Sequence, residues 1–175
     1  MLDPEAGRLE HRVAATLVVL LAQPLNKVAA LRLADVVLDG DSAGIRLGRG
    51  TAFIPSPFDA MVRELVGCRP HLNTGTNPTS PWLFPGKRAG RHVSPSGLRL
   101  RVMAMGVDLV AARTGALRQL VVDCPPAVVA DMLGYHQETV ERHAALAGSK
   151  WGSYAALRGG SSPRRRSLAE ASRRA

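Results

Sequence analysis

The segment from Leu31 to Pro57 sets the fold class of this chain, because it interrupts a sequence that otherwise favours helices. Its short runs VVLDG, IRLG and TAFIP lean toward β-structure and are separated by glycine-containing turns. We predict two or three antiparallel strands at residues 35–39, 44–48 and 51–54. Of the 175 residues, 46% are hydrophobic and only 4% aromatic, which favours helices built on Leu, Val and Ala. The predicted class is mainly α with a small antiparallel β-sheet (α+β).

Hydrophobic periodicity predicts helices on both sides of this segment. The first covers Leu9 to Ala30, as one helix or as two divided at Pro24, because proline removes a backbone donor. An amphipathic helix is predicted for 57–68, and further helices for 96–105, 112–122, 126–133 and 137–145. Between them we expect a loop rich in Gly, Pro, Asn and Thr at 69–81, a buried anchor WLFPG and a basic loop GKRAGRHVSP.

Bulk properties exclude several classes of protein. The longest apolar run, VAATLVVLLA (13–22), is about half the ~20 residues that a bilayer-spanning helix needs, so it predicts a buried helix and no membrane partner. Cys68 and Cys124 form no CxxC pair and lack histidines at metal spacing, so we expect free thiols in a reducing cytoplasm and no metal site. The net charge of +9 favours a polyanionic partner such as nucleic acid.

The stretch VVADMLGYHQETVERHAALAG (128–148) has the pattern of two helices joined by a glycine turn. Ala130, Gly134 and Val140 stand where helix-turn-helix units place a small residue, the turn glycine and a β-branched residue. In that geometry the start of the second helix reaches base edges. The exposed candidates there are Gln137, Glu138, Glu141 and Arg142. The pattern also fits an ordinary helical hairpin, and the two glutamates disfavour contact with phosphates.

Several segments, in their order along the chain, resemble the catalytic domain of tyrosine recombinases, the phage integrase family. They are AALRLADV (29–36), LGRG before TAFIP, LFPG (83–86), TGALRQL (114–120), LGYH (133–136) and the closing WGSYAA. The resemblance extends from about residue 10 to residue 155, and is strongest to divergent integrase-like proteins of actinobacteria. It implies a recombinase catalytic-domain fold that acts on double-stranded DNA with no metal and no cofactor.

The resemblance also implies a chemistry in which a tyrosine attacks a DNA phosphodiester. Two arginines clamp the phosphate oxygens, a lysine protonates the leaving hydroxyl, and histidines orient the phosphate. Arg118 matches the arginine of the family's His-x-x-Arg box, and His136 matches the histidine of the LGH box after a shift of one residue. Arg49 stands at the position of the hairpin lysine, and His143 at the position of the nucleophile.

Three catalytic positions depart from the family pattern. Pro24 stands where the first arginine is expected, Gly115 replaces the histidine of the His-x-x-Arg box, and His143 replaces the tyrosine. Because the loss of one transition-state donor typically costs about a hundredfold or more in rate, we expect ordinary strand cleavage to be lost. Two rescues remain open: His143 could attack phosphate itself, or Tyr154 or Tyr135 could supply a hydroxyl.

Basic side chains spread along the chain are the candidate DNA contacts. They are Arg49, Lys87, Arg88, Arg91, Arg99, Arg101, Arg118 and Arg142, with Gln137 as a further contact. Purely structural interpretations exist beside these. Arg118 could pair with Asp131, His136 could cap a helix, and Arg49 could be a solvated turn residue.

We therefore expect a DNA-binding protein, a degenerate recombinase catalytic-like domain at residues 1–158 followed by a disordered Arg-rich tail at 159–175. The alternatives are an active DNA strand transferase with a displaced nucleophile, a transcriptional regulator that reads a site through Val128 to Gly148, and a decaying gene fragment with no role. The family usually clamps DNA with a preceding helical domain. Either a homo-oligomer or a partner that supplies such a domain would complete that clamp.

Overall fold

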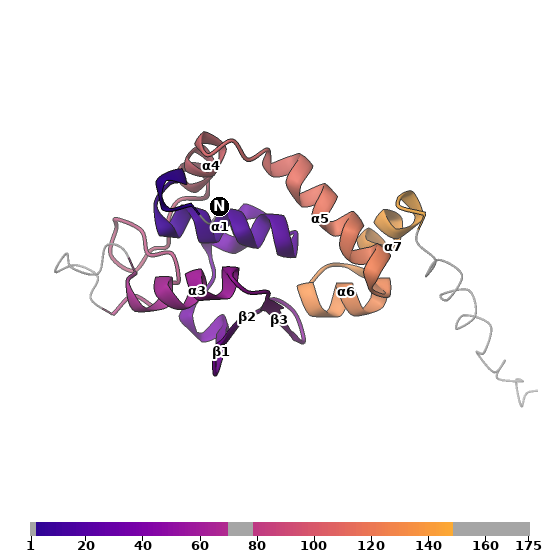
Figure 1. Ribbon diagram of the computed structural model, residues 1–175, viewed down its shortest axis with the longest axis horizontal. Helices are drawn as coiled ribbons and strands as arrows, with labels where there is room; N and C mark the ends of the chain where they lie inside the picture. The colour runs from indigo at the N-terminus through magenta and orange to yellow at the C-terminus, as the bar shows by residue number, and fades with distance from the viewer. Residues whose placement is uncertain (1–2, 70–78, 149–175) are drawn as a thin grey trace, which may run out of the picture.

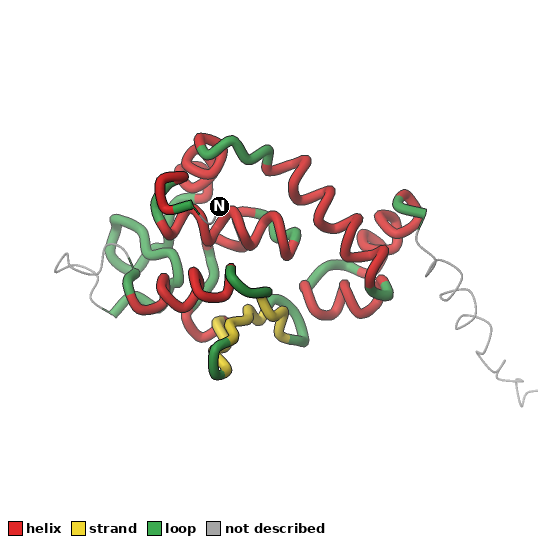
Figure 2. The backbone as a smooth tube through the Cα atoms, in the orientation of Figure 1, coloured by secondary structure: helices red, strands yellow, loops and turns green. Residues whose placement is uncertain are grey.

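The computed structural model describes residues 3–69 and 79–148. Within them, a 3₁₀ turn (Pro4–Ala6), α1 (Leu9–Leu21), α2 (Leu25–Ala29) and a second 3₁₀ turn (Leu33–Asp35) precede β1 (Val36–Asp39), β2 (Ser42–Arg46) and β3 (Thr51–Ile54). Five helices follow: α3 (Phe58–Gly67), α4 (Pro95–Ala104), α5 (Leu109–Asp123), α6 (Pro126–Leu133) and α7 (Gln137–Leu146). The predicted class, mainly α with a small antiparallel sheet, is confirmed (Figure 2). The predicted segment 151–158 with Tyr154, the predicted tail 159–175 and most of the predicted loop 69–81 lie outside the described residues.

Helix α1 forms the centre of the core. Every residue from Val13 to Val18 is buried. A helix that is apolar on nearly all sides is stable when neighbours cover each face, and α1 contacts α2, α3, α4 and α5. Figure 1 shows α1 between α4 and α5 on one side and α3 with the sheet on the other. Among the described residues, no helix is long and apolar enough to cross a membrane.

The first helical region is divided at Pro24, which confirms the second of the two predicted arrangements. Helix α1 ends at Leu21, and Ala22 adopts the left-handed conformation with φ 54°. Pro24 then occupies the N-cap position of α2. A proline is tolerated there because the first backbone N–H groups of a helix have no partner inside the helix.

The three strands form one antiparallel sheet in the order β1-β2-β3. Asp39 pairs with Ser42 across a two-residue turn, and Arg46 pairs with Thr51 across the turn that carries Arg49. The first turn therefore falls at residues 40–41, so that β2 begins at Ser42 and the predicted strand 44–48 was placed two residues too late. The sheet packs against α3 through its buried side chains, which are Ala43, Ile45, Ala52 and Ile54.

Helix α5 begins three residues before the predicted start at 112, because Asp108 caps it. The Oδ1 atom of Asp108 accepts hydrogen bonds from the backbone N–H groups of Val110 and Ala111, at 3.0 and 3.1 Å. Helix α6 has the predicted bounds, α3 and α4 differ from the predicted helices by one residue at each end, and α7 ends one residue later than predicted. The predicted helix α5 therefore began too late because Asp108 was not recognised as its capping residue.

The WLFPG segment anchors the chain between α3 and α4. Leu83 and Phe84 are buried, as predicted, and the backbone N–H of Leu83 donates to the carbonyl of Leu31 at 2.8 Å. Trp82 is half-buried, and its Nε1 donates to the carbonyl of Gly90 at 3.0 Å. These contacts tether the predicted basic loop, whose Lys87, Arg88 and Arg91 are exposed.

Candidate functional site

Helices α6 and α7 and their turn are built as the residue pattern predicted. Gly134 ends α6 in the left-handed conformation with φ 67°, and the backbone N–H of Tyr135 donates to the carbonyl of Ala130 at 3.0 Å. Ala130 and Val140 are buried, so the small residue and the β-branched residue lie between packed helices. The start of α7 is exposed at Gln137.

The α1–α2 connection and helix α2 together satisfy the last carbonyls of α6. Gln23 Nε2 donates to the carbonyl of Leu133 at 3.2 Å, and Lys27 Nζ donates to the carbonyl of Gly134 at 2.9 Å. Carbonyls at a helix C-terminus lack partners inside the helix and carry partial negative charge, so an amide and an ammonium group stabilise them. The region around Pro24 is thereby joined to the α6–α7 turn.

The turn between β2 and β3 joins the same place. The backbone N–H of Arg49 donates to the carbonyl of Asp131 at 2.8 Å, which fixes the turn against the end of α6. The Arg49 side chain is exposed. Two residues that the sequence placed far apart, Arg49 and His136, therefore belong to one region of the surface.

Tyr135 sits at the centre of this junction. Its hydroxyl donates to the carbonyl of Ala22 and accepts a hydrogen bond from Arg113 Nε at 3.2 Å. Lys27 Nζ lies 5.7 Å from the centre of the Tyr135 ring, a cation–π distance. The hydroxyl considered above as a substitute nucleophile is thus engaged in holding three elements together.

Arg113 is a site residue that the sequence interpretation missed. It lies on α5 five residues before Arg118, and only its position near that residue could have drawn attention to it. Because the partner that identifies it, Tyr135, stands 22 residues further along the chain, the contact depends on the tertiary fold.

His143 lies among three arginines. Its side chain is half-buried, and its Nδ1 atom is buried without a hydrogen-bond partner. Burial lowers the pKa of His143 below the ordinary value of 6.5, and the charges of Arg142, Arg118 and Arg113 lower that pKa further. The imidazole is therefore neutral near pH 7. Its buried Nδ1 is closed to a phosphate arriving from solvent, which disfavours attack through that atom.

The structure supports some of the purely structural roles considered for Arg118, His136 and Arg49 and not others. Arg118 is exposed, and within residues 3–69 and 79–148 it forms no ion pair with Asp131 or any other acidic side chain. His136 occupies the N-cap position of α7, yet its side chain makes no capping hydrogen bond. Gln137 Nε2 donates to Glu141 Oε1 at 2.7 Å, so this predicted DNA contact is engaged within its own helix.

The predicted catalytic residues and DNA contacts fall into separate groups. Arg49, Arg118, His136, Arg142 and His143 belong to the β2–β3 turn, α5 and α7. The basic loop with Lys87, Arg88 and Arg91 lies at the other end of the molecule along its long axis (Figure 1). Arg99 and Arg101 are exposed on α4. The structure therefore does not gather all of these residues on one small surface.

The described residues hold no group of three or more His, Cys, Asp or Glu side chains that could bind a metal ion. Cys68 and Cys124 are both free thiols, the first exposed and the second half-buried. The chemistry available around the α6–α7 turn is that of guanidinium, ammonium, imidazole and phenol groups. Such a set can bind an anion through charge-assisted hydrogen bonds.

These helices and the small sheet define a tyrosine recombinase-like fold. No protein-family model and no curated protein matches the sequence, whereas solved structures match the fold. The site-specific recombinase XerH in a post-cleavage complex with palindromic difH substrate superposes with a TM-score of 0.61 at 14% identity, over 91% of this chain and 48% of XerH. Its pre-cleavage complex with difH gives 0.59 at 14% identity, over 90% and 47%. The XerA recombinase gives 0.55 at 12% identity, over 93% and 63%. The chain thus spans about half the length of the XerH chain that it matches.

Proposed function

We propose that the protein binds duplex DNA without cutting it, through a surface that we call the α5–α7 face. This face consists of Arg49, Arg113, Arg118, His136 and Arg142. One observation supports the proposal most. The Arg49, Arg118 and Arg142 side chains have no hydrogen-bond or ion-pair partner among the described residues, in a fold that is shared with XerH bound to its difH substrate.

Unpaired guanidinium groups on one face create a field that attracts a polyanion. Each phosphate that such a group neutralises releases counterions from the duplex, which makes the affinity depend steeply on salt. The same face carries Glu138 and Glu141 on α7, which repel phosphates near the start of that helix. We therefore expect backbone contacts to contribute most of the affinity.

The residues present fit binding better than cleavage. Pro24 offers no cation where the family resemblance expects the first clamp arginine, and Gly115 offers no side chain at the histidine position. The Tyr135 hydroxyl is engaged with Ala22 and Arg113, and His143 Nδ1 is buried. Arg118 alone keeps a family clamp position, and one donor is a weak basis for transition-state stabilisation.

The test is fluorescence anisotropy of the full chain on duplex DNA across a range of salt concentrations. We expect binding that weakens steeply with salt. Arg118→Ala should weaken binding on every sequence and lower the slope of log K against log salt by about one. Arg8→Ala is the matched control, since it removes the same charge from the N-terminal end of α1, away from the α5–α7 face. Binding that is independent of salt, or equally affected by both variants, would contradict the proposal.

The arrangement of α6 and α7 supports a second function, a regulator that reads a specific site through α7. Gln137 and Arg142 are exposed on α7, and Gly134 forms the turn before it. Selection of bound sequences from a random duplex pool tests this function. A preferred site that is lost in Gln137→Ala supports the regulator, whereas a pool without enrichment leaves backbone binding as the function. Duplexes of increasing length show in the same titrations whether a second copy of the chain joins.

A further inference from the structure

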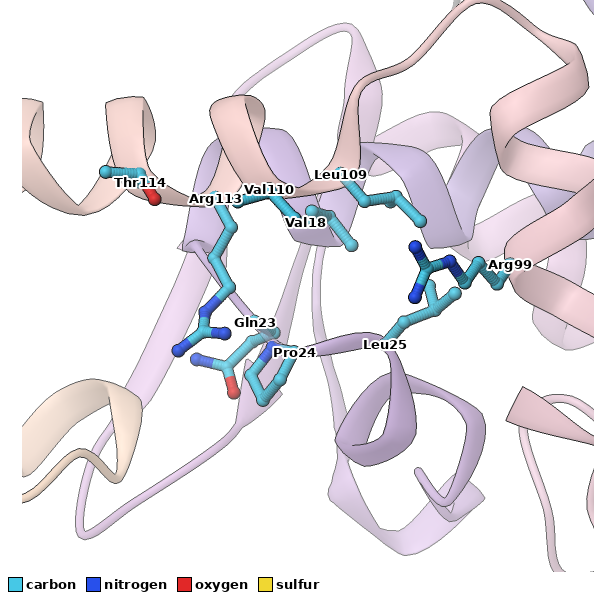
Figure 3. A pocket seen from close by; sticks show the side chains of 9 residues that line it. All are labelled: Val18, Gln23, Pro24, Leu25, Arg99, Leu109, Val110, Arg113 and Thr114. Atoms are coloured by element: carbon cyan, nitrogen blue, oxygen red, sulfur yellow. The ribbon is translucent and has the colours of Figure 1, made fainter. Parts of the chain in front are cut away.

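A pocket of about 180 Å³ lies where the α1–α2 connection faces α4 and α5. Its volume is more than ten times the ~15 Å³ that one water molecule needs, so a small polyatomic ion fits. In Figure 3 the Arg99 side chain from α4 points into the space between the labelled side chains, and the Arg113 side chain from α5 lines the other side, with its guanidinium beside Gln23. Gln23 and Pro24 line the pocket from the α1–α2 connection.

The pocket carries positive charge without a matching acid. Neither Arg99 nor Arg113 forms an ion pair with a carboxylate in the part of the chain that the structure describes. Arg113 donates only its Nε to Tyr135, which leaves the two terminal nitrogens of its guanidinium for a ligand. Two like charges that line one pocket repel each other, and an anion between them converts this repulsion into attraction.

Gln23 adds a second sign that the pocket is incomplete. Its side chain is fully buried, and its Nε2 donates to the carbonyls of Leu21 and Leu133, which fixes the orientation of the amide. Its Oε1 then has no hydrogen-bond partner. A buried acceptor without a donor costs free energy, so this wall of the pocket is not fully satisfied among the described residues. The Oε1 atom itself is closed to solvent, so the guanidinium groups are the expected ligand contacts.

We propose that this pocket binds one phosphate group between Arg99 and Arg113. The α1–α2 wall lacks a cation because Pro24 stands at the expected clamp position, and α4 and α5 supply two guanidinium groups. The phosphate can come from the DNA backbone, in which case the site rests on the proposed function, or it can be a free phosphate or phosphate monoester. Guanidinium groups suit both sources, because their parallel N–H donors match two phosphate oxygens.

The experiment titrates the full chain with inorganic phosphate at constant ionic strength, by calorimetry. We expect saturable binding that Arg99→Ala weakens by about tenfold or more, the usual effect of losing a charge-assisted hydrogen bond. Arg101→Ala is the matched control, because Arg101 is exposed on the same helix and does not line the pocket. Arg113→Gln should also weaken binding. Tyr135→Phe removes the hydroxyl that contacts Arg113 Nε and Ala22 but keeps the guanidinium group, so this variant should retain binding.

Absence of saturable phosphate binding, or an equal loss of affinity in Arg99→Ala and Arg101→Ala, would overturn the proposal that the pocket binds phosphate. Competition then identifies the source of the phosphate. If phosphate displaces duplex DNA from the wild type more than chloride does at equal ionic strength, the pocket holds a backbone phosphate. If phosphate binds without displacing DNA, the pocket holds a free phosphate or monoester. If DNA binding depends on Arg118 but the protein binds no phosphate, the phosphate pocket is rejected and the proposed function stands. If the protein binds phosphate in the pocket but does not bind DNA, the proposed function is rejected and the phosphate pocket stands.

Discussion

Gly48 and Gly134 meet backbone to backbone at the base of the α5–α7 face. A Cβ on Gly48 would lie 2.7 Å from the backbone nitrogen of Gly134, and a Cβ on Gly134 would lie 3.5 Å from Cα of Gly48. No side chain fits between the two turns, so the β2–β3 turn rests directly on the α6–α7 turn. This contact is what places Arg49 beside the helices that carry His136 and Arg142.

Gly134→Ala should destabilise the protein more than the same change at Gly90. Both glycines have positive φ, 67° and 68°, so each substitution costs about 1–2 kcal/mol of backbone strain. Only at Gly134 does the added Cβ also collide with backbone, that of Leu47, whereas nothing lies within 4 Å at Gly90. Thermal unfolding measures the difference, at about 2–4 °C per kcal/mol for a chain of this size. Equal melting temperatures for the two variants would show that the contact between the turns is loose.

Tyr135→Phe should lower the free energy of unfolding by about 1–3 kcal/mol, because the buried carbonyl of Ala22 loses its donor. The ring and its contact with Lys27 remain in this variant. Urea unfolding measures the loss. Trp82→Phe serves as the comparison, since it removes the Nε1 hydrogen bond from this half-buried side chain to the exposed residue Gly90 and should cost less. A Tyr135→Phe variant as stable as the wild type would remove Tyr135 from its role as the junction.

The pKa of His143 should rise toward its ordinary value in Arg118→Ala, because that variant removes one of the positive charges that lower it. NMR titration of the histidine ring protons measures this change. Arg101→Ala is the control, since the charge of Arg101 acts on His11, whose pKa is lowered mainly by burial. We expect each variant to move only its own histidine. A His143 resonance that is unaffected by Arg118→Ala would show that the charge of Arg118 does not act on the imidazole.

The lowered pKa of His143 also sets the direction of a pH effect on stability. The unfolded chain binds a proton at His143 more readily than the folded protein does, so the stability from the neutral imidazole is complete above about pH 6.5. It is lost as the pH falls from 6.5 toward the lower pKa of the folded protein. His143→Gln should flatten the unfolding free energy across that interval in urea titrations at several pH values. An unchanged pH profile in this variant would contradict the assignment.

A nicked suicide duplex should yield no covalent adduct with the full chain. Pro24 stands at the expected position of the clamp arginine, and among the described residues the Tyr135 hydroxyl is engaged and the Nδ1 atom of His143 is buried, so strand cleavage is not expected. Denaturing gels and mass spectrometry detect a phosphoprotein link, with an active tyrosine recombinase as the positive control. An adduct that disappears in His143→Phe or Tyr154→Phe would instead support a strand transferase with a displaced nucleophile.

Much of the secondary structure followed from local chemistry in the sequence. Helix α6 begins at Pro126 and is ended by Gly134, and Pro24 divides the first helical region. Proline restricts the backbone and glycine allows a left-handed conformation, whatever the surrounding fold. The two-residue turn at 40–41 and the Asp108 cap were misplaced or overlooked, which shifted β2 and the start of α5. Such errors are local, since a strand or a helix moves by a few residues without a change of fold.

The sequence by itself therefore determined the fold class, the division of the helices and the excess of positive charge. Only the tertiary structure decided which charges act together, because side chains meet through packing between distant segments. Arg113 meets Tyr135 across α5 and the α6–α7 turn, and Arg99 faces the same pocket as Arg113 from α4. The basic loop with Lys87 lies at the far end of the molecule, although its composition resembles that of the other basic segments. Residue type fixes what chemistry is available, and the contacts among α1, α5 and α6 fix where that chemistry acts.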